Sequence, residues 1–112
     1  MAGVTINGGI ANGGHSVFHV TPVVDADYVV GAEDETVAVT QLTAARTVTL
    51  PGAPATGRRV KVKDADGSAT ALKTITVSGN GHNIDGAAQS VIALAFGRLV
   101  VEYTGARWSV VG

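Results

Sequence analysis

The sequence predicts an all-β protein, and three observations lead to this prediction. The 112 residues include 15 glycines, aromatic residues make up only 4%, and Val, Thr and Ala recur in short stretches that alternate apolar with polar side chains. Alternation with a period of two is typical of strands that bury one face. We therefore expect a compact antiparallel β-sandwich or barrel of seven to nine short strands, with an extended N-terminal arm.

The chain has the length of a single domain with one hydrophobic core. The pattern of residue types changes near Pro22. Residues 1–24 contain two glycine pairs and scattered apolar residues that follow no helical period. We predict that residues 1–24 form the arm and that residues 25–112 form the folded domain. The apolar residues of the arm are Val4, Ile6, Ile10, Val17, Phe18 and Val20.

Strand and turn signals follow one another through the predicted domain. Strands are expected at residues 36–40, 46–50, 59–63, 73–77, 90–94, 98–103 and 108–111. Turn residues separate them at 51–54, 64–67, 79–81 and 85–86. The earlier strands place Val, Ile or Leu on one face and Thr, Lys or Arg on the other, as half-buried antiparallel strands do. Residues 41–46 are the one helix candidate, and they would make about one turn.

The last two strands are expected to form a hairpin that contributes most to the core. Leu99, Val101 and Tyr103 share one face of their strand, and Trp108 and Val110 share one face of the next. Burying the Trp108 indole would be the largest single apolar contribution in the chain. An indole that faced a neighbouring subunit instead would matter mainly for assembly.

Composition and charge exclude several classes of function. The formal net charge is −1 and charged residues make up 15% of the chain, so nucleic acid and anionic membranes are not expected partners. Cysteine is absent, which excludes disulfides and thiolate metal sites. No apolar run approaches the ~20 residues of a membrane span, and the first residues lack a signal-peptide pattern. We expect a soluble product made in the cytosol.

An ordered set of short motifs resembles a β-domain of tailed-bacteriophage structural proteins. The motifs are Ala45–Pro51 (ARTVTLP), Lys63–Asp64, Ile84–Gly86 (IDG) and Trp108, and the resemblance covers residues 25–112. In that family the domain is a building block of tail-fibre tips and of small capsid decoration (cement) proteins, usually as homotrimers. The family has no catalytic motif to carry over.

The resemblance and the short arm together suggest a homotrimeric capsid decoration protein. It would be made in the host cytoplasm and sit on the outer capsid surface of the virion, bound to the major capsid protein through the apolar arm residues. The residues expected to pack in the core or at the trimer contact are Tyr28, Leu99, Val101, Tyr103, Trp108 and Val110. The alternative is a tail-fibre tip or receptor-binding module that recognises the host surface through residues 64–71 and 79–86. Only about two dozen residues precede the domain, which favours the capsid over a long fibre.

Candidate metal ligands are sparse. His15 and His19 are four residues apart and would share a face of a strand, so a metal site across a trimer axis is conceivable, but no third ligand lies at useful spacing. Asp64, Asp66 and Gly67 resemble the start of a calcium loop, yet the later ligands are missing, which favours a plain Asp-Gly turn. His82 is interpreted as a turn residue. We expect no metal and no cofactor.

The remaining charged clusters give no catalytic arrangement. Glu33, Asp34 and Glu35 form a dense acidic group. Paired carboxylates are used in glycoside hydrolysis, but adjacent residues on a strand point to opposite faces and rarely converge on one bond, so we interpret the group as a solvated loop between two strands. No Gly-x-Ser-x-Gly elbow is present. A basic outer face, which would either meet an acidic capsid or protect strand edges, is predicted from Arg46, Arg58, Arg59, Lys61, Lys63 and Lys73. We expect no enzyme activity and no small-molecule substrate.

Overall fold

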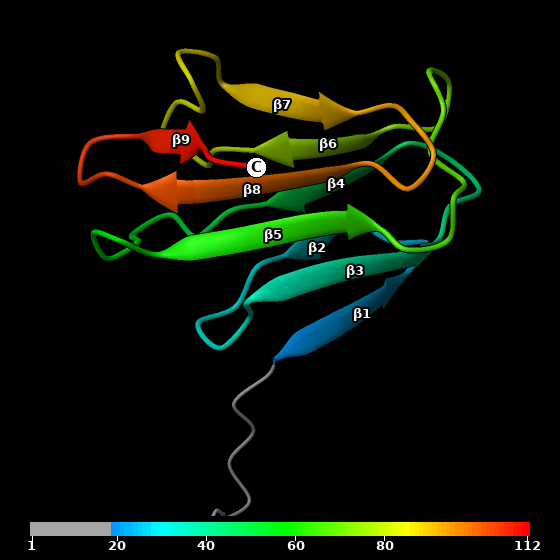
Figure 1. Ribbon diagram of the computed structural model, residues 1–112, viewed down its shortest axis with the longest axis horizontal. Helices are drawn as coiled ribbons and strands as arrows, with labels where there is room; N and C mark the ends of the chain where they lie inside the picture. The colour runs from blue at the N-terminus through cyan, green and yellow to red at the C-terminus, as the bar shows by residue number, and fades with distance from the viewer. Residues whose placement is uncertain (1–18) are drawn as a thin grey trace, which may run out of the picture.

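The computed structural model describes residues 19–112, which form nine strands in two sheets (Figure 1). No helix occurs in this range, so the described chain has no helix that could cross a membrane. The strands are β1 (Val20–Val24), β2 (Tyr28–Val29), β3 (Thr36–Gln41), β4 (Arg46–Thr49), β5 (Arg59–Asp64), β6 (Ile75–Ser78), β7 (Gln89–Ile92), β8 (Arg98–Tyr103) and β9 (Trp108–Val110).

The chain winds alternately through the two sheets, which corrects the expectation of antiparallel pairing throughout. The five-stranded sheet has the order β1-β3-β5-β8-β9 and the four-stranded sheet the order β2-β4-β6-β7. From β1 to β6 each strand lies in the other sheet from the one before it, and each pairs in parallel with the strand two earlier. Only β5/β8, β6/β7 and β8/β9 pair antiparallel. The sheets do not close into a barrel.

The parallel winding has a simple physical cause. Period-two alternation specifies which face of a strand is buried, and it carries no information about the direction of the neighbouring strand. The turn at Pro51–Pro54 does not fold β5 back onto β4 but leads the chain across to the other sheet. Because each crossing reverses the chain, every second strand runs in the same direction.

The core fills the space between the sheets with rows of side chains that stack in register. Val37, Val62 and Leu99 align across β3, β5 and β8, while Val48 and Val77 align across β4 and β6. All five are buried. Parallel in-register pairing places like side chains over one another, so the short valine-rich strands build one continuous apolar layer.

The C-terminal hairpin closes this core. Trp108 is fully buried and meets Tyr103 edge to face, with ring centroids 5.3 Å apart. Of the residues that the sequence assigned to packing, Leu99, Val101, Tyr103 and Trp108 are buried, and Tyr28 and Val110 pack against the core while partly exposed. The turn at residues 104–107 is closed by a backbone hydrogen bond from the N–H of Thr104 to the carbonyl of Arg107, 2.9 Å long.

The first strand extends the sheet into the segment that the sequence assigned to the arm. Residues 20–24 form β1, an edge strand that pairs in parallel with β3, and Val23 is buried in the core. Val20 lies on the exposed side of this strand. Pro22 lacks an N–H and is tolerated because β1 is an edge strand. The remaining arm residues, Val4, Ile6, Ile10, Val17 and Phe18, lie outside the described range.

Residues 41–46, the one helix candidate in the sequence, do not form a helix. Gln41 completes β3, Leu42 is buried, and Arg46 begins β4. The Asp25 carboxylate accepts hydrogen bonds from the backbone N–H and the hydroxyl of Thr43, at 2.8 and 2.7 Å. The Asp25 side chain, which lies outside the segment, thus gives the Thr43 N–H a hydrogen-bond acceptor that competes with a helical one.

We expect Trp108→Ala to lower the free energy of unfolding by about 3 to 5 kcal/mol, because it empties a closed site between the sheets. Urea denaturation at fixed protein concentration measures the change. Val111→Ala is the matched control, since Val111 lies exposed beside the same hairpin, and it should shift stability by no more than about 0.5 kcal/mol. A Trp108→Ala loss as small as that of the control would contradict the closed packing of the indole.

Candidate functional site

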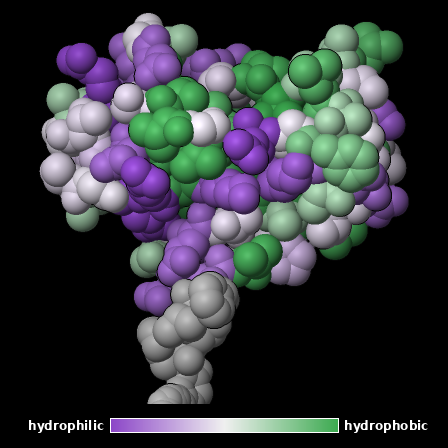
Figure 2. Space-filling view, in the orientation of Figure 1, coloured by the Kyte–Doolittle hydropathy of each residue, from purple (hydrophilic) through white to green (hydrophobic). Residues whose placement is uncertain are grey.

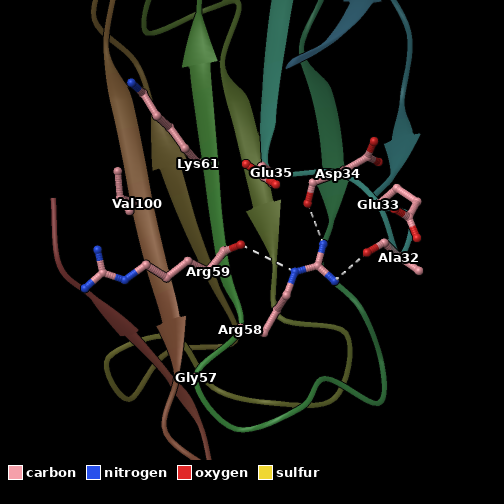
Figure 3. A pocket seen from close by; sticks show the side chains of 9 residues that line it. All are labelled: Ala32, Glu33, Asp34, Glu35, Gly57, Arg58, Arg59, Lys61 and Val100. Atoms are coloured by element: carbon pink, nitrogen blue, oxygen red, sulfur yellow. Dashed lines mark hydrogen bonds between the residues drawn. The ribbon is translucent and has the colours of Figure 1, made fainter. Parts of the chain in front are cut away.

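An open groove of about 540 Å³ lies beside the loop between β2 and β3 (Figure 3). Carboxylates and cations face each other across it. The lining residues are Ala32, Glu33, Asp34, Glu35, Gly57, Arg58, Arg59, Lys61 and Val100. Such mixed walls can form hydrogen bonds and ion pairs with a polar partner surface.

Arg58 joins the two loops that border this groove. Its guanidinium donates hydrogen bonds to the carbonyl oxygens of Asp34 at 2.6 Å, Gly31 at 3.0 Å and Ala32 at 3.4 Å. Figure 3 shows the side chain reaching across to the β2–β3 loop. Arg58 was expected on a basic outer face, and the structure instead uses its charge to satisfy backbone carbonyls that have no sheet partner.

Asp34 is the buried member of the acidic group, whereas Glu33 and Glu35 are exposed. Its carboxylate accepts hydrogen bonds from the hydroxyls of Thr21 and Tyr28, both at 2.5 Å, and from the N–H of Gly31 at 2.7 Å. Burial raises the pKa of Asp34, but these bonds outweigh it and the net pKa lies below the ordinary value. The solvated-loop interpretation therefore holds for both glutamates and is wrong for Asp34.

Asp64 is a second buried carboxylate, at the opposite end of the strands. Its Oδ1 accepts the N–H groups of Asp66 at 3.3 Å and Gly67 at 3.1 Å, and its Oδ2 accepts those of Ala69 and Phe96, both at 3.0 Å. Burial raises the pKa of Asp64, and the four N–H groups lower it to below the ordinary value. The side chain that resembled a calcium ligand is thus directed at its own backbone.

The histidines that the sequence singled out differ in their surroundings. His82 contacts the Gly52 carbonyl at 3.0 Å, and its ring lies edge to face on Tyr103. His19 borders Asp34, and His15 lies outside the described residues. Within residues 19–112 no three His, Cys, Asp or Glu side chains gather as metal ligands would.

Two of the six residues of the predicted basic face form ion pairs in the described part of the chain. Arg46 pairs with Asp25 and Arg59 with Glu102, each at 3.0 Å. The Lys63 ammonium donates to the Phe96 carbonyl. Sequence spacing alone identifies none of these pairs, because the partners lie far apart in the chain and meet only through the winding.

No family model matches the chain, and a search of curated proteins gives no match.

We expect the protein to lose stability as the pH falls below about 4. The pKa of Asp64 is lowered in the folded state below its ordinary value, so the unfolded chain takes up a proton first and acid favours unfolding. Asp64→Asn should lower the free energy of unfolding at neutral pH by roughly 3 kcal/mol, since an amide cannot accept all four N–H groups. It should also flatten the pH dependence.

Urea denaturation between pH 2.5 and 7 measures both effects. Asp66→Asn is the matched control, because Asp66 is exposed and its carboxylate meets only the neighbouring Ser68 hydroxyl. The control should keep the pH slope of the unmodified protein. An Asp64→Asn variant with that same slope would contradict the assignment.

Proposed function

We propose that this chain is a bacteriophage structural protein, a capsid decoration protein that acts as a homotrimer on the outer surface of the head. The observation that carries the proposal is that the motif residues are those on which the fold depends. Arg46 pairs with Asp25, Leu50 and Ile84 are buried, and Asp64 anchors two loops. A chance likeness of composition would not select such positions.

The IDG motif illustrates this dependence. Ile84 is buried and bridges to Trp108, and Asp85 accepts the N–H of Val110 at 3.0 Å. Gly86 has a φ of 85°, a conformation that glycine adopts without strain. Ile84 and Asp85 thus hold the loop before β7 against the terminal hairpin, and Gly86 permits the turn between them and β7. This arrangement supports a shared fold with the phage β-domains.

A decoration protein functions by binding energy and needs no reaction centre. A trimer with cyclic symmetry matches a local three-fold position on a shell, and three attachment arms then act as one multivalent ligand of the major capsid protein. The arm would join the domain at β1, whose outer side exposes Val20, Pro22 and Val24. Contacts begun by the arm can continue onto this edge strand.

The alternative, a receptor-binding fibre tip, is less well supported by the arrangement of the loops. Residues 64–71 follow β5 and residues 79–86 follow β6, and these strands end at opposite ends of the sandwich (Figure 1). The two loops therefore do not form one contact surface. This placement favours the decoration proposal over the fibre tip.

Sedimentation equilibrium of the purified full-length protein at micromolar concentration should give three times the monomer mass of 11.2 kDa. Assembly buries additional surface on each subunit, and this stabilises a small domain whose own core is limited in size. A monomer under these conditions would remove the central assumption of the proposal.

Deleting residues 1–18 should abolish binding to capsids while leaving a folded trimer. This deletion spares β1, whereas a deletion to residue 24 would remove an edge strand and confuse folding with attachment. Co-sedimentation with capsids that lack the protein measures binding, and sedimentation of the variant alone measures assembly. A shortened protein that still decorates capsids would show that the arm is not the attachment site.

A further inference from the structure

A second, apolar groove of about 350 Å³ lies where β7 leads into β8. The buried side chains of Ile92 and Leu99 line it, together with the exposed side chains of Val91 and Leu94. Figure 2 shows hydrophobic side chains over the upper right of the molecule, the side on which the chain passes from β7 to β8 in Figure 1. A volume of this size accommodates one large apolar side chain of a partner.

The loop beside this groove is held in a strained conformation. Phe96 has a φ of 60°, which is uncommon for a residue other than glycine. The Asp64 carboxylate holds its N–H and the Lys63 ammonium holds its carbonyl. The ring lies so close to Gly67 that a Cβ there would approach it to 2.5 Å. Strain that is maintained by a buried charge is typical of functional segments.

These contacts fix the loop but leave its large apolar side chains exposed. Leu94 remains 77% exposed and Phe96 remains 58% exposed. The loop is thus fixed by polar contacts from beneath while it presents apolar side chains to solvent. Exposed apolar groups on a fixed loop, next to an apolar groove, indicate an interaction surface.

A positive charge beside the groove indicates which kind of partner surface would bind there. Arg98 lines the groove and is exposed, and within residues 19–112 its side chain has no ion-pair or hydrogen-bond partner. Lys63 lies beside it in the register of β5 and β8. A complementary surface therefore carries an apolar side chain next to a carboxylate.

A second copy of the chain fits this requirement poorly. Glu33 and Glu35 form no ion pair within residues 19–112, but they line a groove with Arg59 and Lys61, and a contact through these glutamates would bring those cations against Arg98 and Lys63. The other exposed or half-exposed carboxylates are engaged within their own chain by cations, hydroxyls or N–H groups, namely Asp25, Asp27, Asp66, Asp85 and Glu102. This favours a different protein as the occupant.

We infer that the β7–β8 groove is a second attachment site, which takes an apolar side chain flanked by a carboxylate on the outer surface of the major capsid protein. The inference rests on the proposed decoration function. In Figure 1, β7 and β1 lie at opposite edges of the molecule. Contacts at both edges fix the orientation of the domain on the shell, which an arm at one edge alone does not.

The test uses full-length protein and capsids that lack it, with binding measured by co-sedimentation over a range of concentrations. Leu94→Ser and Arg98→Glu should each raise the Kd by about tenfold or more, as the loss of a central contact does. The matched controls are Val29→Ser, at a valine that is 67% exposed on β2, and Arg107→Glu, at an exposed arginine in the β8–β9 turn. Both controls should bind as the unmodified protein does.

The outcomes separate the two proposals. If the unmodified protein does not bind capsids, the decoration function fails and the second site fails with it. If it binds and both groove variants bind equally well, the groove inference is overturned while the decoration function stands. If the groove variants sediment as monomers where the controls are trimers, the groove is a subunit contact and the capsid is not its occupant.

Discussion

The buried carboxylate of Asp64 is the constraint on which one end of the molecule depends. In the register of β1, β3 and β5, Asp64 continues a row that begins with Val23 and Val39, where an apolar side chain would fit. Burying a charge without partners costs several kcal/mol. Four N–H groups offset that cost, and they come from two loops, residues 65–74 and the β7–β8 loop. The bonds that make the charge tolerable therefore also hold both loops in place.

At the opposite end of the strands, Asp34 and Arg58 likewise hold a loop in place through hydrogen bonds to its backbone. The Asp34 carboxylate accepts hydrogen bonds from two hydroxyls and one N–H. The Arg58 guanidinium donates hydrogen bonds to three carbonyl oxygens of the β2–β3 loop, which contains Asp34. This need follows from the winding. A chain that crosses between sheets after each strand leaves loop backbone groups without ladder partners, unlike a hairpin. Charged side chains supply those partners: Asp34 is buried and Arg58 is half-buried. The need for these charges therefore follows from the parallel topology.

The alternating pattern located β3 to β9 to within about two residues, because alternation directly reports burial of one face. It missed β1, where Pro22 interrupts a strand exposed on its outer side, and β2, which is two residues long. It could not give strand direction. One available signal was overlooked: Val60 and Val62 place Asp64 on the buried face two residues later. No comparable periodicity marks Asp34, whose partners Thr21 and Tyr28 lie across the winding.

The β7–β8 groove arises from a mismatch in strand length. β8 has six residues and β9 has three, and the pairing of the C-terminal segment with β8 reaches only to Val100. Arg98 and Leu99 lie beyond this pairing, so no strand of the described chain covers the outer edge of β8 at these two residues. An open apolar edge invites pairing with any other strand, and a charged residue on it opposes such pairing. The same charge favours a partner that brings a carboxylate, so Arg98 can discourage aggregation and select a specific occupant at once.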